Sequence, residues 1–157
     1  MTGAGRRSAG LLLWRRVADR RLEVLLGHPG GPYFAGQDAG VWSIPKGEYL
    51  LDEEPLAAAH REFVEEVGVA PPDTEPLPLG EVRLRSGKVV TAWALEGEID
   101  LAEFRSNDFT MRWPPHSGRL QSFPELDRVQ WFDLAEARER LAPGQRPLLD
   151  RLEAAVD

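Results

Sequence analysis

The sequence contains no cysteine. This absence excludes disulfide bonds, thiolate metal sites and a cysteine nucleophile. Lysine is also scarce, because Lys46 and Lys88 are the only lysines among 19 basic residues. Together with 15 glycines and 13 prolines, this preference for arginine is typical of a GC-rich genome and by itself indicates no chemistry.

Positive charge is in deficit, since the formal net charge is −7. A protein that binds the nucleic-acid backbone is normally basic, so we expect no nucleic-acid partner. No apolar stretch approaches the roughly 20 residues that span a bilayer. The short apolar run at residues 11–14 is interrupted at once by Arg15 and Arg16, unlike a secretory signal. We therefore expect a cytoplasmic protein without a membrane partner.

The residues that are present fit one domain. Of 157 residues, 42% are apolar and 29% charged, which is enough to build a buried core. Short apolar runs predict strands over residues 9–14, 22–26, 41–44, 79–84, 89–95 and 128–132. Helical spacing and caps predict helices over residues 56–67, 134–141 and 146–155. The segments without such patterns are a loose start at 1–7, a Gly- and Pro-rich loop at 28–40 and a long irregular segment at 105–124. This order predicts a single α/β domain spanning 1–157, with a mixed β-sheet between helices.

The segment 56–67 has the clearest helical pattern in the sequence. Pro55 suits the first helical position, and Gly68 suits the left-handed residue just past the end. The apolar residues that recur at helical spacing are Leu56, Ala59, Phe63 and Val67. We expect this stripe to face the core.

Three carboxylates share another face of the same helix, namely those of Glu62, Glu65 and Glu66. Like charges at this spacing repel by about 0.2–0.5 kcal/mol per pair, and the helix C-terminus disfavours anions. A bound cation would relieve this repulsion, and clusters of carboxylates select hard ions such as Mg²⁺ or Mn²⁺. The alternative is a solvated acidic face, which is common on helices.

Residues 47–69 resemble the Nudix box, the signature G-x5-E-x7-R-E-U-x-E-E-x-G-U of the Nudix hydrolases, in which U is a bulky apolar residue. Every fixed position is filled, by Gly47, Glu53, Arg61, Glu62, Phe63, Glu65, Glu66, Gly68 and Val69. The resemblance implies an α/β/α sandwich and a divalent-metal-dependent hydrolase that splits pyrophosphate linkages in nucleoside diphosphate derivatives.

By position, the resemblance also implies roles for individual residues. Glu62, Glu65 and Glu66 are similar to metal ligands, and so is the backbone carbonyl of Lys46. Glu53 is expected to tie the loop to the helix, and Arg61 to orient the carboxylates.

The sequence leading into the box, W-x-x-P-K-G at residues 42–47, resembles that of particular branches of the family. It is similar to that of Nudix members acting on dinucleoside polyphosphates and on diphosphoinositol polyphosphates. Glu125 lies six residues before Trp131, similar to an acidic residue outside the box in the dinucleoside polyphosphate enzymes, where it serves as a ligand or a base. The alternative for Glu125 is an ordinary surface carboxylate in a turn.

Further residues are candidates for binding the substrate. Aromatic rings stack on bases, and arginine binds phosphate in a bidentate manner. The candidates are Lys46, Tyr33, Arg112, Trp113 and Arg119, with Phe34, Phe109 and Phe123 nearby in sequence. The alternative is that these loops fold their aromatic rings back on the sheet. We expect Trp93 and His60 to be packed, and His116 indicates no catalytic role.

We therefore predict a Nudix-type hydrolase that uses Mg²⁺ or Mn²⁺ and acts on a small nucleotide, with a dinucleoside polyphosphate preferred. One alternative is hydrolysis of nucleoside triphosphates, oxidised ones included. Another is a nucleotide-sensing module without turnover, although the complete box favours catalysis.

Overall fold

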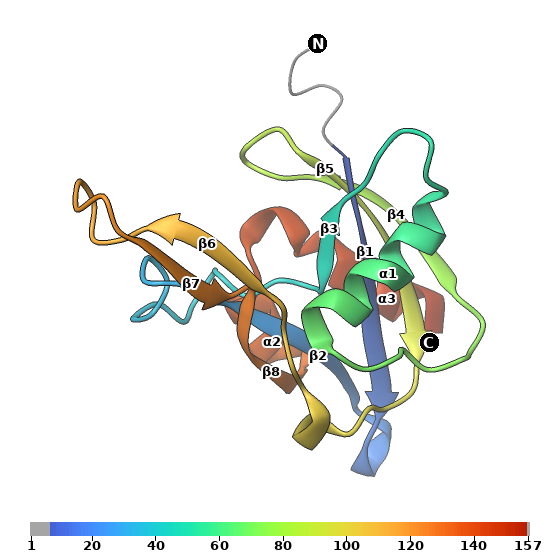
Figure 1. Ribbon diagram of the computed structural model, residues 1–157. Coiled ribbons are helices and arrows are strands. Elements are labelled where there is room, and N and C mark those ends of the chain that lie inside the picture. Colours follow the sequence, from blue (N-terminus) through green and yellow to red (C-terminus); the bar gives the residue numbers. More distant parts are fainter. Residues whose placement is uncertain (1–6, 157) are drawn as a thin grey trace.

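The computed structural model describes residues 7–156 and contains a central mixed sheet flanked by helices, with a separate hairpin projecting to one side (Figure 1). Its strands are β1 (Arg7–Arg16), β2 (Leu22–Pro29), β3 (Lys46–Glu48), β4 (Leu77–Arg83), β5 (Val89–Glu96), β6 (Asp108–Arg112), β7 (Leu120–Pro124) and β8 (Leu126–Asp133). Its α-helices are α1 (Pro55–Val67), α2 (Leu134–Arg140) and α3 (Pro147–Val156). Short 3₁₀ turns are η2 (Ala18–Arg20), η3 (Leu101–Glu103) and η4 (Pro143–Gln145). None of the helices within 7–156 has the length and apolar character needed to cross a membrane.

The main sheet has the strand order β4-β5-β1-β2-β8, and β3 also pairs with β1. β1 runs parallel to β5 and antiparallel to its other partners, so the sheet is mixed. One edge of β1 is divided between two strands, because Ser8, Ala9 and Gly10 pair with β3 whereas the far end of β1 pairs with β2.

The two faces of the sheet carry separate apolar clusters, because side chains alternate along each strand. Leu12 and Trp14 of β1 pack into one cluster with Leu148 and Leu152 of α3. The alternate residues of β1, Ala9, Leu11 and Leu13, pack into the other cluster against α1, where Phe63 is fully buried. Helices therefore cover both faces, which confirms the predicted α/β/α arrangement.

The caps of α1 agree with the sequence pattern. The Glu54 side chain accepts a hydrogen bond from the Ala57 amide, and Pro55 occupies the first turn. Gly68 ends the helix in the left-handed conformation with φ 85°, and its amide donates to the Val64 carbonyl. The helix that carries the three box glutamates therefore has defined ends.

The structure corrects three expectations. The segment 105–124 is not irregular, because it contains the antiparallel β6–β7 hairpin, in which Phe109 pairs with Phe123. The prediction of a strand at 41–44 is wrong, because Trp42 and Ser43 form only isolated bridges. The strand in this part of the chain is β3, which begins at Lys46. The loose start expected at 1–7 falls mostly on residues 1–6, which lie outside the described residues, while Arg7 is the first residue of β1.

Candidate active site

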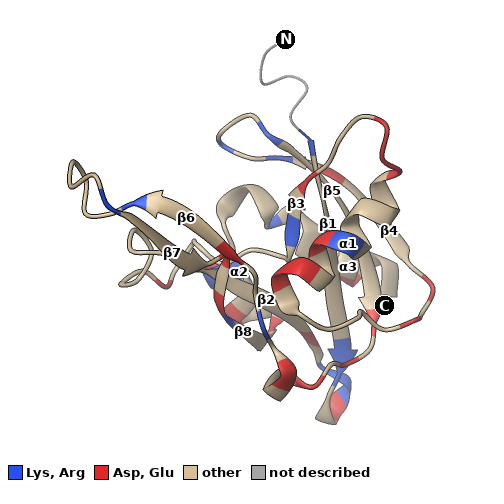
Figure 2. Cartoon of the chain, in the orientation of Figure 1, with Lys and Arg blue, Asp and Glu red and all other residues tan. Residues whose placement is uncertain are grey.

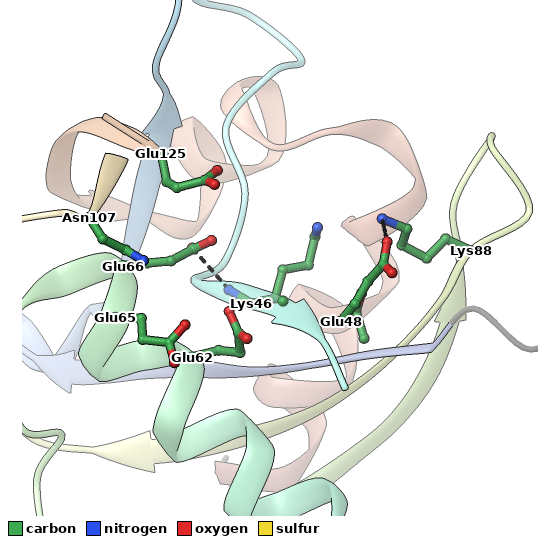
Figure 3. A pocket seen from close by; sticks show the side chains of 10 residues that line it. Lys46, Glu48, Glu62, Glu65, Glu66, Lys88, Asn107 and Glu125 are labelled. Carbon is green, nitrogen blue, oxygen red and sulfur yellow. Dashed lines mark hydrogen bonds and ion pairs between the residues drawn. The ribbon is translucent and has the colours of Figure 1, made fainter. Parts of the chain in front are cut away.

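A cavity of about 450 Å³ opens between α1, β3 and the start of β8. Its lining is almost entirely polar and consists of Ser8, Lys46, Gly47, Glu48, Glu62, Glu65, Glu66, Lys88, Asn107 and Glu125. Figure 3 shows Glu62, Glu65 and Glu66 extending from α1, and Glu125, the residue just before β8, on the opposite side of Glu66 from Glu62 and Glu65. Lys46 extends into the space between Glu125 and the Lys88–Glu48 pair. The cavity thus has an acidic side and a side that carries two lysines.

Arg61 organises the acidic side. Its Nη1 donates to Glu62 over 2.7 Å and to Glu65 over 3.1 Å, while Nε and Nη2 donate to both oxygens of Glu53 over 3.0 Å. Glu53 also accepts from the Leu50 amide over 3.1 Å. The Arg61 hydrogen bonds lower the pKa of Glu53, and the hydrogen bond to Glu53 raises the pKa of Arg61. Glu53 therefore connects the loop at Leu50 to the helix through Arg61.

Burial sets the electrostatics of the remaining carboxylates. It raises the pKa of Glu66 to about 8, although the Lys46 amide donates to Glu66 Oε1 over 3.2 Å and opposes this shift. Burial also raises the pKa of Glu62 and of Glu125. Glu66 experiences the charges of Glu62 and Glu125 as well, so these carboxylates repel one another across the cavity.

The donor set fits a hard divalent cation. Glu62, Glu65, Glu66 and Glu125 offer carboxylate oxygens, and a cation would relieve the repulsion between these partly buried carboxylates. A side chain at Gly47 would collide with the Glu62 carboxylate, so only glycine leaves that carboxylate its place on the cavity wall. As arranged in residues 7–156, no three acidic or histidine side chains are close enough to hold an ion. Arg61 pairs with one oxygen, Oε2, of both Glu62 and Glu65, and the other oxygen of each carboxylate is not bonded to Arg61.

A short strap of residues 105–107 brings Glu125 to α1. The Arg105 amide donates to the Val67 carbonyl over 2.8 Å, and the Asn107 amide donates to the Glu65 carbonyl over 3.0 Å. The carbonyl of Asn107 in turn accepts from the Glu125 amide over 2.8 Å. Because a side chain at Gly68 would collide with the Arg105 carbonyl, the close approach of the strap requires glycine there.

Comparison with known proteins identifies this arrangement. The sequence profile of the NUDIX domain family matches residues 5–152. The chain belongs to the Nudix family. This confirms the resemblance seen in the box and, with it, the prediction of a Nudix phosphoanhydride hydrolase. No match was found among curated protein sequences.

Solved Nudix structures share the fold. The binary complex of a Caenorhabditis elegans Ap4A hydrolase is 22% identical with a TM-score of 0.65, covering 95% of this chain and 97% of that chain. The NUDIX domain of Shewanella oneidensis NrtR, complexed with ADP ribose, is 18% identical with a TM-score of 0.62, covering 96% and 88%. The Mycobacterium smegmatis Nudix hydrolase RenU is 21% identical with a TM-score of 0.61, covering 98% and 88%. At these identities the likeness concerns the fold.

The structure divides the predicted site residues of this Nudix domain into two groups. Lys46 and the box glutamates Glu62, Glu65 and Glu66 line the cavity together with Glu125, and Arg61 and Glu53 stand behind them. The other predicted residues do not line it. Tyr33 and Trp113 form an edge-to-face pair with centroids 5.2 Å apart, where the 28–40 loop meets the β6–β7 hairpin. Arg112 and Arg119 lie beside Trp113 at the outer end of that hairpin.

The packed aromatic residues agree with expectation. Trp93 is partly buried against the cluster under α1. His60 Nδ1 lies 3.0 Å from the Leu56 carbonyl on the same helix. Neither residue lines the cavity.

Sequence reasoning missed four residues of the cavity, namely Ser8, Glu48, Lys88 and Asn107. Lys88 forms an ion pair with Glu48 over 2.8 Å. Figure 2 shows this distribution of charge: acidic segments lie along α1, and basic segments lie on β3 and on the turn between β4 and β5. One signal was available in the sequence: the only two lysines of an arginine-rich chain both line this Nudix cavity.

Proposed function

We propose that this Nudix protein is a divalent-metal-dependent hydrolase that cleaves the pyrophosphate linkage of a nucleoside diphosphate derivative, with a dinucleoside polyphosphate as the preferred substrate. The observation that carries the proposal is the cavity itself, in which Glu62, Glu65, Glu66 and Glu125 lie opposite the only two lysines of the chain, one of which is paired with a fifth glutamate, Glu48. A polyphosphate and its metal ion together need both kinds of charge.

The acidic side is the proposed metal site. Glu62, Glu65, Glu66 and the carbonyl of Lys46 would hold Mg²⁺ or Mn²⁺. Such an ion, when bound, neutralises phosphate oxygens and lowers the pKa of water. Arg61 donates to Glu62 and Glu65 and also to Glu53 in the structure. It would therefore hold the helix in a fixed position relative to the loop that precedes it.

The basic side would hold the phosphate chain. The ammonium groups of Lys46 and Lys88 supply positive charge to a highly anionic substrate that approaches a protein of net charge −7. In the reaction, a water oxygen attacks phosphorus as the bridging P–O bond breaks, and the water proton passes to a carboxylate. Glu125 is the proposed acceptor, because it reaches the cavity from outside the metal cluster and burial raises its pKa toward the range useful for a base.

The choice of substrate rests on the position of the β6–β7 hairpin. This hairpin begins after Asn107 and ends before Glu125, so both of its roots are at the cavity. A phosphate chain held by the lysines would leave a second nucleoside near the hairpin, where Tyr33 and Trp113 offer aromatic surface. The residues W-x-x-P-K-G at 42–47 favour the same class.

The similar structures support a nucleoside diphosphate derivative in general. Ap4A and ADP ribose, named in two of them, both join a nucleoside diphosphate to another group. Hydrolysis of nucleoside triphosphates and nucleotide sensing without turnover are the competing functions. The full set of cavity carboxylates favours turnover over sensing.

The test is a substrate screen with the purified chain in Mg²⁺, in Mn²⁺ and in EDTA. Diadenosine tetraphosphate, ADP ribose, 8-oxo-dGTP and ATP are compared by chromatography of the products. We expect metal-dependent cleavage with the highest kcat/KM for diadenosine tetraphosphate. Preference for a triphosphate would reject the substrate, and nucleotide binding without cleavage in either metal would indicate a sensing module. The cytoplasmic location stays a prediction from the sequence.

A further inference from the structure

Ser8 is a buried polar residue that still lacks a partner. It lies near the start of β1, is 0% exposed and lines the cavity. Within the described part of the chain its Oγ makes no hydrogen bond. Proteins pair nearly all buried hydroxyl groups, because an unpaired one forfeits its hydration. The missing partner of Ser8 is therefore expected to come from the contents of the cavity.

Strand register places Ser8 on the lysine side. Ser8 pairs with Glu48 on β3, and Gly10 pairs with Lys46. Residues opposite each other in a sheet, and those two apart on a strand, direct their side chains to the same face. Ser8 thus shares one face with Glu48 and Lys46.

The same relation extends to Lys88. Ser8 pairs with Val90 on β5, and Lys88 precedes Val90 by two residues. A side chain at Gly10 would come within 2.8 Å of the Lys46 Cβ, so the stem of Lys46 passes over Gly10, next to Ser8. The unpaired hydroxyl is accordingly next to both lysines rather than to the carboxylates of α1.

We propose that the Ser8 hydroxyl donates a hydrogen bond to a phosphate oxygen of the substrate and fixes the position of the phosphate chain between Lys46 and Lys88. Both lysines supply charge on long, flexible stems, which attract a phosphate without fixing its orientation. Ser8 projects from a central strand that is paired on both sides, so its hydroxyl is held in place. It adds a directed hydrogen bond to the charge that the two lysines supply. This inference rests on the proposed function.

The experiment compares Ser8→Ala with the wild type in two measurements. The first is isothermal titration calorimetry in Mg²⁺ with α,β:β,γ-bis(methylene) ATP, in which carbon replaces both bridging oxygens of the triphosphate, so neither linkage can be cleaved. We expect the Kd to rise by about 10-fold, since hydrogen bonds to charged groups are strong. The second is thermal unfolding in EDTA without ligand. Because the substitution removes an unpaired buried hydroxyl, we expect the Tm to stay the same or to rise by about 2–4 °C.

Ser43→Ala is the matched control. The Ser43 hydroxyl is paired in the protein, because it donates to the Ile44 carbonyl over 2.7 Å and accepts from Gln145 over 3.0 Å. Its loss should lower the Tm and leave the Kd near the wild-type value. Ser43 does not line the cavity.

Each other outcome for Ser8→Ala counts against the inference. An unchanged Kd, a lower Tm or failure to fold would mean that the hydroxyl has a structural role or binds only water. If the wild type cleaves nucleotides while Ser8→Ala binds the analogue normally, only the Ser8 inference fails. If the wild type binds the analogue through Ser8 but cleaves no nucleotide, the inference holds and the proposed hydrolysis fails. Absence of binding by the wild type overturns both.

Discussion

The backbone amide of Glu125 donates to the backbone carbonyl of Asn107 over 2.8 Å, which closes the base of the β6–β7 hairpin at the rim of the cavity. The Asn107 amide is itself bonded to the carbonyl of Glu65 on α1. Two backbone hydrogen bonds thus connect a box glutamate to the glutamate outside the box. The position of Glu125 consequently depends on how closely the strap of residues 105–107 approaches the end of α1.

The first prediction tests this approach through Gly68. Gly68→Ala should destabilise the protein by at least about 2 kcal/mol, because a positive φ costs a side chain about 1–2 kcal/mol and the new Cβ would also collide with the Arg105 carbonyl. Gly118→Ala is the control, since Gly118 has φ 75° and open space around its Cβ position. Urea unfolding measures both variants. Equal losses of stability in the two variants would show that the strap moves away from the new Cβ without a cost in free energy.

The second prediction concerns Glu66 in the metal-free protein. Burial raises its pKa from 4.5 to about 8 in the folded state, so the folded state binds this proton more tightly than the unfolded state does. The stabilisation from protonated Glu66 is therefore complete below about pH 4.5 and is lost as the pH rises through about 8.

Glu66→Gln removes this titration and keeps an oxygen that accepts from the Lys46 amide. In EDTA, the variant should gain stability relative to the wild type as the pH is raised from 5 to 9. Urea unfolding at pH 5, 7 and 9 measures the difference, and the exposed Glu139→Gln serves as control. A difference that does not change with pH would contradict the assigned burial.

The third prediction concerns catalysis by the metal cluster. Glu65→Gln and Glu66→Gln should each lower kcat by at least about 100-fold at saturating Mg²⁺, because charge stabilisation by a bound metal contributes several kcal/mol. Neither change should reduce stability without metal, since each relieves repulsion among carboxylates. Glu139→Gln makes the same charge change outside the cavity and should retain activity. Near-wild-type turnover in both cavity variants would falsify the metal assignment.

The sequence predicts the parts of this site that are local. The caps and apolar spacing of α1 fix which face carries Glu62, Glu65 and Glu66, and the structure has the same helix within one residue. Lys88 and Ser8 could not be assigned in this way, because they reach the cavity only through the pairing of β1 with β3 and β5. Such pairing depends on long-range packing, which a single sequence does not display.

The β6–β7 hairpin was missed for a related reason. Its strands are only five residues long and mostly exposed, so they lack the apolar alternation of a strand that packs on a core. The loop that includes Gly31 and Tyr33 packs against Phe109 and Trp113 and supports the hairpin, and this contact is remote in sequence. An isolated hairpin has little stability in water, so this support matters.

The fourth prediction concerns Glu125. Glu125→Gln should lower kcat more than it raises KM, as expected for a group that acts mainly in the transition state. It should also alter the limb of the pH–rate profile that reports the base. Steady-state kinetics from pH 6 to 9 supply both measurements. Wild-type kinetics across this range would remove Glu125 from the proposed machinery and leave it only a lining residue.

The last prediction separates substrates by means of the hairpin. Arg112 and Trp113 lie outside the cavity, so a triphosphate held by the lysines and the metal has little need of them. A dinucleoside polyphosphate has a second nucleoside, which can stack on an aromatic ring and place a phosphate near an arginine. The combined Arg112→Ala and Trp113→Ala substitution should lower kcat/KM for diadenosine tetraphosphate by about 10-fold or more, roughly one stack and one phosphate contact.

ATP hydrolysis by the same double variant should change much less, and Leu120→Ala is the control for disturbance of the hairpin, because Leu120 is exposed opposite Arg112. Loss of the Tyr33–Trp113 contact could also shift the roots of the hairpin, and a shift of Glu125 would slow both substrates equally. The ratio of the two kcat/KM values therefore distinguishes direct binding from displacement of Glu125. A lower ratio of diadenosine tetraphosphate to ATP indicates binding by the hairpin, and an unchanged ratio indicates that the hairpin only supports the cavity.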